Sequence, residues 1–205
     1  MIDDTDSLET MKDDPSLWVP PHDGELAPED ATLLNARARK WPGGQIPRAE
    51  LSSLPSNSMY LRITMRPSMQ PNDFHWAMYH FCDPDFGGMK YHIHGSTGRW
   101  MTDYVVERGI LGTNFLIGLI RIGSIDYAES KDAVMSSVSQ EDQTLNEKGG
   151  TTCRTWLLRV LERLRAESLL DYDSINDLER EVFAFGNQHL RDCAMNMQPR
   201  PVIQS

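Results

Sequence analysis

The sequence predicts an α+β fold, in which an antiparallel β-sheet packs against helices. Segments with period-2 alternation or short apolar runs occupy the middle of the chain, and amphipathic helical segments follow them. The 205 residues show no internal repeat and are enough for one domain with a sizeable core. We therefore expect a single α+β domain over residues 59–193, preceded by an extension over 1–58 and followed by a tail over 194–205.

The extension is rich in Pro, Asp, Glu and Ser and contains only scattered apolar residues. Such a composition cannot bury enough apolar surface to form a packed core. One short helix is predicted over residues 28–40, because acidic residues stand near its start and basic residues near its end, as the helix dipole favours. The remainder of residues 1–58 is expected to be irregular and acidic.

The predicted sheet is built from strands joined by turns. Alternation of polar and apolar residues begins at Met59, and the aromatic-rich second strand leads into the turn sequence of residues 83–88, which contains Asp, Pro and two glycines. Consecutive hairpins of this kind give an antiparallel meander. The five strands are expected at residues 59–66, 73–81, 89–95, 100–107 and 114–124.

Three helices are predicted after the strands. The first covers residues 126–138. The strongest is capped by Thr151 or Thr152 and has apolar residues at helical spacing, and the last covers residues 176–189 after a Ser174 cap. The apolar positions of the strongest helix are Trp156, Leu157, Val160, Leu161 and Leu164.

Charge and hydropathy exclude several classes of function. A formal net charge of −10 repels phosphate backbones and anionic lipid headgroups, so no nucleic acid and no membrane partner is expected. The acidic N-terminal stretch has no apolar core of a signal peptide, and no apolar run approaches the roughly 20 residues needed to span a bilayer. We expect a cytoplasmic protein.

The three cysteines, Cys82, Cys153 and Cys193, predict free thiols, because their number is odd and no CxxC spacing occurs. Cys153 stands at the start of the strongest predicted helix. Unpaired backbone N–H groups and the positive end of the helix dipole stabilise a thiolate at such a position and can also hold an oxyanion. A small buried apolar role is the alternative for this residue.

A thiol nucleophile needs a base, and the histidines of the predicted strands supply candidates. His75 opens the second strand, and His92 and His94 share one face of the third. If the hairpin pairs these strands in the right register, one member of the His92/His94 pair stands beside His75 and orients its ring. The register decides which of the two takes this part.

These residues resemble a known family. The run His75-Trp76-Ala77-Met78-Tyr79, the later Tyr91-His92 and Gly98-Arg99-Trp100, and Cys153 at a helix start are similar to the circularly permuted NlpC-type, papain-like superfamily and its lecithin retinol acyltransferase branch. The resemblance covers about residues 59–170. It implies a papain-like antiparallel sheet packed on helices, Cys153 as nucleophile, His75 as general base and His92 as the orienting third residue.

The resemblance also implies acyl-transfer chemistry without a cofactor or metal. Family members form acyl-cysteine intermediates as amidases, acyltransferases or phospholipases, so the expected partner is a small-molecule acyl substrate. Thr152 replaces the usual Asn before the cysteine, and Arg154-Thr155-Trp156 replaces an acidic-His-aromatic run, which argues against phospholipid or retinoid substrates. The pattern is closer to a group of fungal proteins of similar length. Five residues are expected to contact substrate: Trp76, Tyr79, His94, Trp100 and Trp156.

Two other interpretations remain open from the sequence. His92 and His94 with His75 could form a three-histidine metal site of cupin type, although Gly95 to Trp100 contains no acidic residue where a cupin has its glutamate. Alternatively the fold could serve as a non-catalytic binding module. Its acidic extension, eleven methionines and five tryptophans would suit a partner surface.

Overall fold

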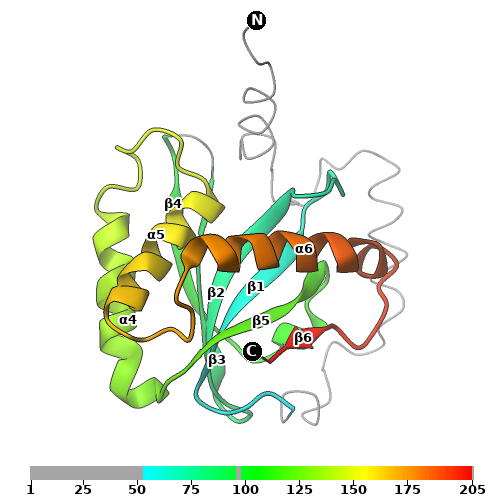
Figure 1. The fold of residues 1–205 in the computed structure, drawn as a ribbon, viewed down its shortest axis with the longest axis horizontal. Helices are drawn as coiled ribbons and strands as arrows, with labels where there is room; N and C mark the ends of the chain where they lie inside the picture. Colours follow the sequence, from blue (N-terminus) through cyan, green and yellow to red (C-terminus); the bar gives the residue numbers. More distant parts are fainter. Residues whose placement is uncertain (1–52, 96–97, 205) are drawn as a thin grey trace, which may run out of the picture.

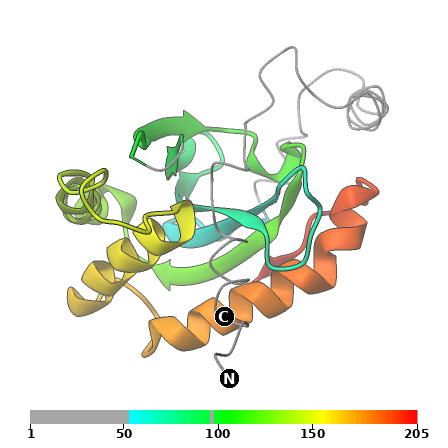
Figure 2. The same cartoon turned by 90° about the horizontal axis from the view of Figure 1, so that it is seen from above.

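A computed structural model describes residues 53–95 and 98–204. The predicted helix at 28–40 and most of the predicted extension lie outside these residues. One six-stranded sheet forms a layer, and three helices cover one of its faces (Figures 1 and 2). The predicted α+β class is therefore confirmed.

The sheet is mixed and is not a simple meander. Its strand order is β4-β3-β2-β1-β5-β6, because β5 crosses to the free edge of β1 and pairs with it antiparallel. Residues 202 and 203, in the predicted tail, add β6 parallel to β5. The strands are β1 Ser58–Met65, β2 Phe74–Asp83, β3 Gly87–His94, β4 Met101–Glu107, β5 Leu116–Ser124 and β6 Val202–Ile203.

The hairpin between β2 and β3 fixes the register of the histidine strands. Asp83 Oδ1 accepts hydrogen bonds from the backbone N–H groups of Asp85 and Phe86, which closes an Asx turn. Gly87 follows at φ +82°, a backbone conformation that a side chain would strain. The ladder then runs from the turn to the pair Met78–Tyr91.

α5 and α6 begin after threonine and serine caps that the sequence predicts, and α4 and α6 extend further than predicted. α4 spans Tyr127–Asp142 after an Asp126 cap, α5 spans Cys153–Ala166 after Thr152, and α6 spans Ile175–Ala194 after Ser174. A short 3₁₀ helix, η2, spans Ile110–Gly112. No helix among residues 53–95 and 98–204 is long and apolar enough to cross a bilayer.

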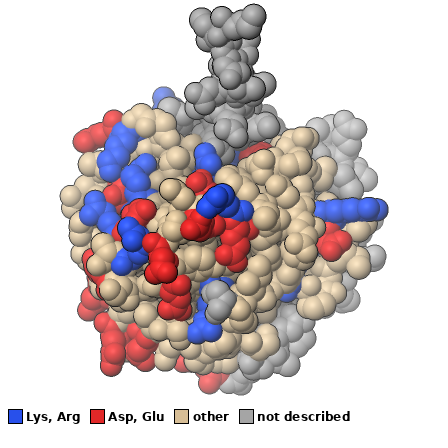
Figure 3. Space-filling view, viewed as in Figure 1, with Lys and Arg blue, Asp and Glu red and all other residues tan. Residues whose placement is uncertain are grey.

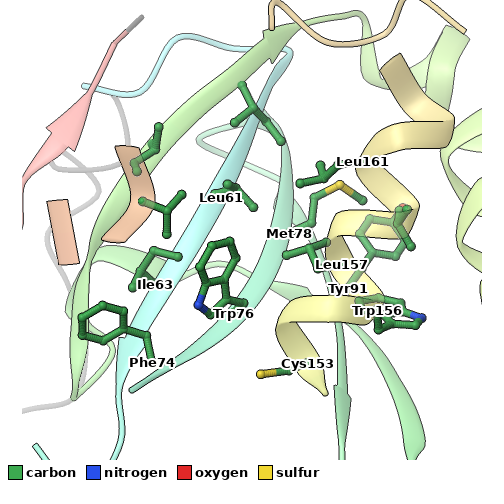
Figure 4. Packing of buried hydrophobic residues seen from close by; sticks show 14 of the residues in the cluster. Leu61, Ile63, Phe74, Trp76, Met78, Tyr91, Cys153, Trp156, Leu157 and Leu161 are labelled. Carbon is green, nitrogen blue, oxygen red and sulfur yellow. The ribbon is translucent and has the colours of Figure 1, made fainter. Parts of the chain in front are cut away.

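The sheet separates two apolar clusters. Alternation along β2 turns Trp76 and Met78 toward the helices, where they pack with Leu157 and Leu161 of α5 (Figure 4). The same alternation turns Tyr79 and the neighbouring odd-numbered residues to the other face, where a smaller cluster forms. The larger cluster, between sheet and helices, contains most of the core.

A buried carboxylate joins α4 to α5. Glu141 accepts hydrogen bonds from Lys148, Arg159 and Arg163 at 2.7 to 3.0 Å, and its side chain is only 3% exposed. Burial alone would raise its pKa, but these three cations lower it to about 2. Figure 3 shows charged side chains of both signs gathered over α4 and α5.

We predict that Glu141→Gln lowers the free energy of unfolding at pH 7 by about 2 kcal/mol, since it removes hydrogen bonds to a charged group. The folded-state pKa of about 2 lies below the ordinary 4.5, so this stabilisation is complete above pH 4.5 and is lost as the pH falls toward 2. Urea unfolding at several pH values measures both effects. Glu162→Gln, which breaks an exposed pair with Arg165, is the matched control and should cost under about 0.5 kcal/mol.

Candidate active site

The start of α5 is fixed by a reciprocal pair of threonine caps. Thr152 Oγ1 accepts from the backbone N–H of Thr155 at 3.0 Å, and Thr155 Oγ1 accepts from the backbone N–H of Thr152 at 2.8 Å. The helix therefore begins at Cys153. This placement confirms the prediction that Cys153 opens the helix, where the first backbone N–H groups have no acceptor within the helix.

Cys153 belongs to the apolar cluster between sheet and helices and is only 1% exposed (Figure 4). Its sulfur accepts a hydrogen bond from Arg66 Nη2 at 3.1 Å. The other terminal nitrogen of this guanidinium, Nη1, forms an ion pair with Asp73 at 3.0 Å. The thiol thus lies next to a positive charge that is itself held by a carboxylate.

A hydrogen-bonded chain crosses three strands on the other face of the sheet. His75 Nε2 lies 2.9 Å from His92 Nδ1, and His92 Nε2 lies 2.7 Å from Asp103 Oδ2. The register explains the second contact, because His92 is directly opposite Asp103 in the β3–β4 ladder. The structure therefore brings His92, and not His94, to the ring of His75.

Burial keeps both imidazoles neutral. It lowers the pKa of His75 well below the ordinary 6.5, and the nearby charges of His92, Arg66, Arg62 and Lys90 lower it further. Burial, with a smaller effect of Lys90, lowers the pKa of His92 to about 4. Burial raises the pKa of Asp103, but the hydrogen bond and charge of His92 and the charge of Lys90 more than offset this, so the carboxyl is ionised at neutral pH.

The protonation states determine the tautomer of each ring. An ionised carboxylate only accepts, so His92 must carry its proton on Nε2 and donate it to Asp103. Nδ1 of His92 is then an acceptor, so His75 donates from Nε2. The basic lone pair of His75 therefore stands on Nδ1, which is the arrangement required of a general base.

His75 and Cys153 lie at the same end of β2, and Arg66 connects them. The β2–β3 ladder ends at Met78 and Tyr91, so the residues of β2 before Met78 are not paired with β3. Arg66 bonds the sulfur of Cys153, and its charge contributes to the lowered pKa of His75. Among the described residues, no direct hydrogen bond joins His75 to Cys153.

No protein-family model, curated protein or solved structure matches this chain. The interpretation of the site accordingly rests on its own geometry.

Four of the five residues expected to contact substrate lie in the core, and His94 is half-buried. Trp76 and Trp156 are at most 1% exposed and belong to the cluster under the helices, with Trp100 at its edge. Tyr79 lies on the opposite face, where its hydroxyl donates to the carbonyl of Glu107 at 2.9 Å. The ring of His94 lies 6.0 Å from that of His92, centroid to centroid. The five residues are thus not brought together into one lining.

The three-histidine metal site does not form in the described part of the chain. Nδ1 of His92 faces Nε2 of His75, and its other nitrogen faces Asp103, so both ring nitrogens are used in hydrogen bonds. No group of three or more His, Cys, Asp or Glu residues is arranged to hold a metal ion within residues 53–95 and 98–204. The described residues therefore give the cupin-type alternative no support.

Arg66 and Asp103 were not predicted as site residues. Asp103 stands on a predicted strand, and a correct β3–β4 register would have placed it opposite His92. Arg66 follows the last residue of β1 and reads in sequence as one polar residue of an alternating strand. Its contact with Cys153 spans 87 positions of sequence, so no local pattern indicates it.

We predict that NMR of ¹⁵N-labelled protein shows the Nε2–H tautomer for both His75 and His92 at pH 7. His92 should gain its second proton only near pH 4. Since the folded-state pKa values are below 6.5, the neutral rings stabilise the native state fully above pH 6.5, and this contribution falls as the pH drops toward 4. An Nδ1–H tautomer of His75, or titration of His92 near 6.5, would contradict the proposed chain.

Proposed function

We propose that this protein is a cysteine-dependent acyl-transfer enzyme, with Cys153 as nucleophile, His75 as general base, and His92 with Asp103 as the groups that orient the base. The observation that carries the proposal is the His75–His92–Asp103 chain at the end of β2 where α5 begins with Cys153. A base oriented by a third group, at the same end of a strand as a thiol at a helix start, supplies the parts that nucleophilic catalysis requires.

In the first half-reaction, Nδ1 of His75 removes the thiol proton, and the sulfur of Cys153 bonds to the carbonyl carbon of an ester, thioester or amide. The carbonyl electron pair moves to oxygen, where backbone N–H groups at the start of α5 stabilise the charge. Collapse of this intermediate breaks the bond to the leaving group, which takes the proton from His75. An acyl-cysteine remains.

In the second half-reaction, water, an amine or a carbon nucleophile gives its proton to His75 and bonds to the same carbon. The carbon–sulfur bond then breaks, and the proton returns to the sulfur of Cys153. A carbon nucleophile within the same molecule would make the product a ring, which suits a cyclase or chain-releasing enzyme of a biosynthetic route in the cytoplasm. The fold we propose for this chemistry is the papain-like, permuted NlpC-type topology.

Access to the thiol requires movement, because Cys153 is only 1% exposed and is bonded to Arg66. Catalytic hydrogen bonds are often long before substrate binds and shorten in the complex. Displacement of Arg66 from the sulfur would free the thiol for its proposed base, His75. Hydrolase, acyltransferase and cyclase activities all fit this description of the site.

The alternative of a non-catalytic binding module is weaker. The three tryptophans within residues 53–95 and 98–204 are at most 4% exposed, so they belong to the core and offer no partner surface. A binding module also gives no reason to hold two neutral, buried histidines in line with a carboxylate, since burying polar rings costs free energy unless they are hydrogen-bonded.

We predict that iodoacetamide alkylates Cys153 at pH 7 faster than Cys193, which is similarly buried at 2% exposure but lies near the end of α6. His75→Ala should slow the reaction of Cys153 at least about tenfold, because thiolate formation loses its base. Mass spectrometry of each cysteine-containing peptide against time and pH gives the rates.

The matched control is His189→Ala on α6, which should leave the Cys153 rate unchanged. A Cys153 that reacts no faster than Cys193, or whose rate ignores replacement of His75, would disprove the catalytic pair. Circular dichroism of each variant establishes that it is folded before rates are compared.

A second prediction separates the two histidines of β3. His92→Ala should reduce the Cys153 alkylation rate and abolish the single tautomer of His75, since it removes the hydrogen bond at Nε2. His94→Ala should have the smaller effect on both, as its ring contacts that of His92 only at 6.0 Å. Equal losses in the two variants would contradict the assignment of His92 as the orienting residue.

A further inference from the structure

Arg66 carries an unused hydrogen-bond donor beside the thiol. Arg66 is 5% exposed. Its Nη1 forms an ion pair with Asp73, and its Nη2 donates a hydrogen bond to the sulfur of Cys153. The third nitrogen, Nε, is buried and has no hydrogen-bond partner among the described residues. Buried donors are nearly always paired, because an unpaired one loses its hydration without compensation, so this N–H marks a place for an acceptor.

The geometry of the guanidinium says what kind of acceptor fits. Nε and Nη2 lie on one edge of the planar group, and the two parallel N–H bonds of such an edge match the two oxygens of a carboxylate. Nη2 of this edge already contacts the sulfur of Cys153. A carboxylate bound there would therefore stand next to the atom that attacks.

The edge is held rigidly before any ligand arrives. Nη1 of Arg66 donates to one carboxylate oxygen of Asp73, and the hydroxyl of Ser68 donates to the other. A braced arginine loses less side-chain entropy on binding, and its fork geometry is specific for planar anions. Lysine could supply the charge at this place but not the paired donors.

We propose that Arg66 selects acyl substrates that carry a carboxylate close to the attacked carbonyl carbon, with the carboxylate bound to the Nε–Nη2 edge. This substrate class rests on the proposed acyl-transfer function. Binding would also draw Nη2 away from the sulfur, so that recognition of the anion frees Cys153 for His75. Arg66 would thus couple selection of the substrate to release of the nucleophile.

The test compares two alkylating reagents of nearly equal size, iodoacetate and iodoacetamide. Each forms a bond between the sulfur and its CH₂ carbon and releases iodide, and only iodoacetate carries a carboxylate next to that carbon. The ratio of their rates at Cys153 cancels differences in thiol ionisation and access. We expect this ratio to exceed that of free cysteine about fivefold or more, as one charge contact near 4 Å predicts even at the dielectric constant of water.

Substitutions assign the preference to Arg66. Arg66→Gln should return the ratio to that of free cysteine, and Arg66→Lys should keep part of it, because the charge remains while the paired donors are lost. Arg154→Gln is the matched control: Arg154 is the next residue of α5, but its guanidinium pairs with Glu179 at 2.9 Å and lies over the ring of Phe183. It should leave the ratio unchanged.

A wild-type ratio no higher than that of free cysteine, or no reaction with either reagent, would overturn the proposal without any variant. An elevated ratio that survives Arg66→Gln in folded protein would also overturn it and leave Arg66 as a brace between β1 and α5. A failure of the proposed function gives a different result. Cys153 would still prefer iodoacetate, but its alkylation rates would be the same in wild type and in His75→Ala. The two failures are therefore distinguishable.

Discussion

The hydrogen bond between His75 and His92 is the interaction on which the candidate site depends. His75 is buried and the His92 side chain is only 12% exposed, so each nitrogen that lost water has to find a partner or remain at a cost in free energy. Asp103 at the end of the chain is ionised and can only accept, so it sets the direction of every donor before it. One carboxylate on an outer strand therefore decides which nitrogen of His75 is basic.

The end of the β2–β3 ladder gives this chain its location. Where β2 and β3 are paired, backbone hydrogen bonds join the strands, and alternate side chains point to opposite faces of the sheet. Before Met78, β2 no longer pairs with β3, and at this end of β2 Arg66 bonds the sulfur of Cys153 and its charge lowers the pKa of His75. The site lies where regular secondary structure ends, as functional sites often do.

Charge is balanced locally throughout this region. Arg66 pairs with Asp73, Lys90 with Asp103, and Arg62 with Glu107 at 3.4 Å. The three cations still lower the pKa of His75, and burial of the ring lowers it as well. The structure thus holds a neutral histidine, and a thiol that is bonded to Arg66.

The sequence by itself determined the α+β class, a threonine cap at Thr151 or Thr152 that starts a helix near Cys153, and the Asp and Gly turn that joins the histidine strands. These depend on periodicity and on contacts within a few residues. Residue spacing left the choice between His92 and His94 to the register, while the family resemblance implied His92, and the pattern predicted a meander where β5 in fact pairs with β1. Only the tertiary structure decided between the histidines and added Asp103 and Arg66. Strand register and the contact between Arg66 and Cys153 join residues far apart in the chain, and no local pattern encodes such pairings.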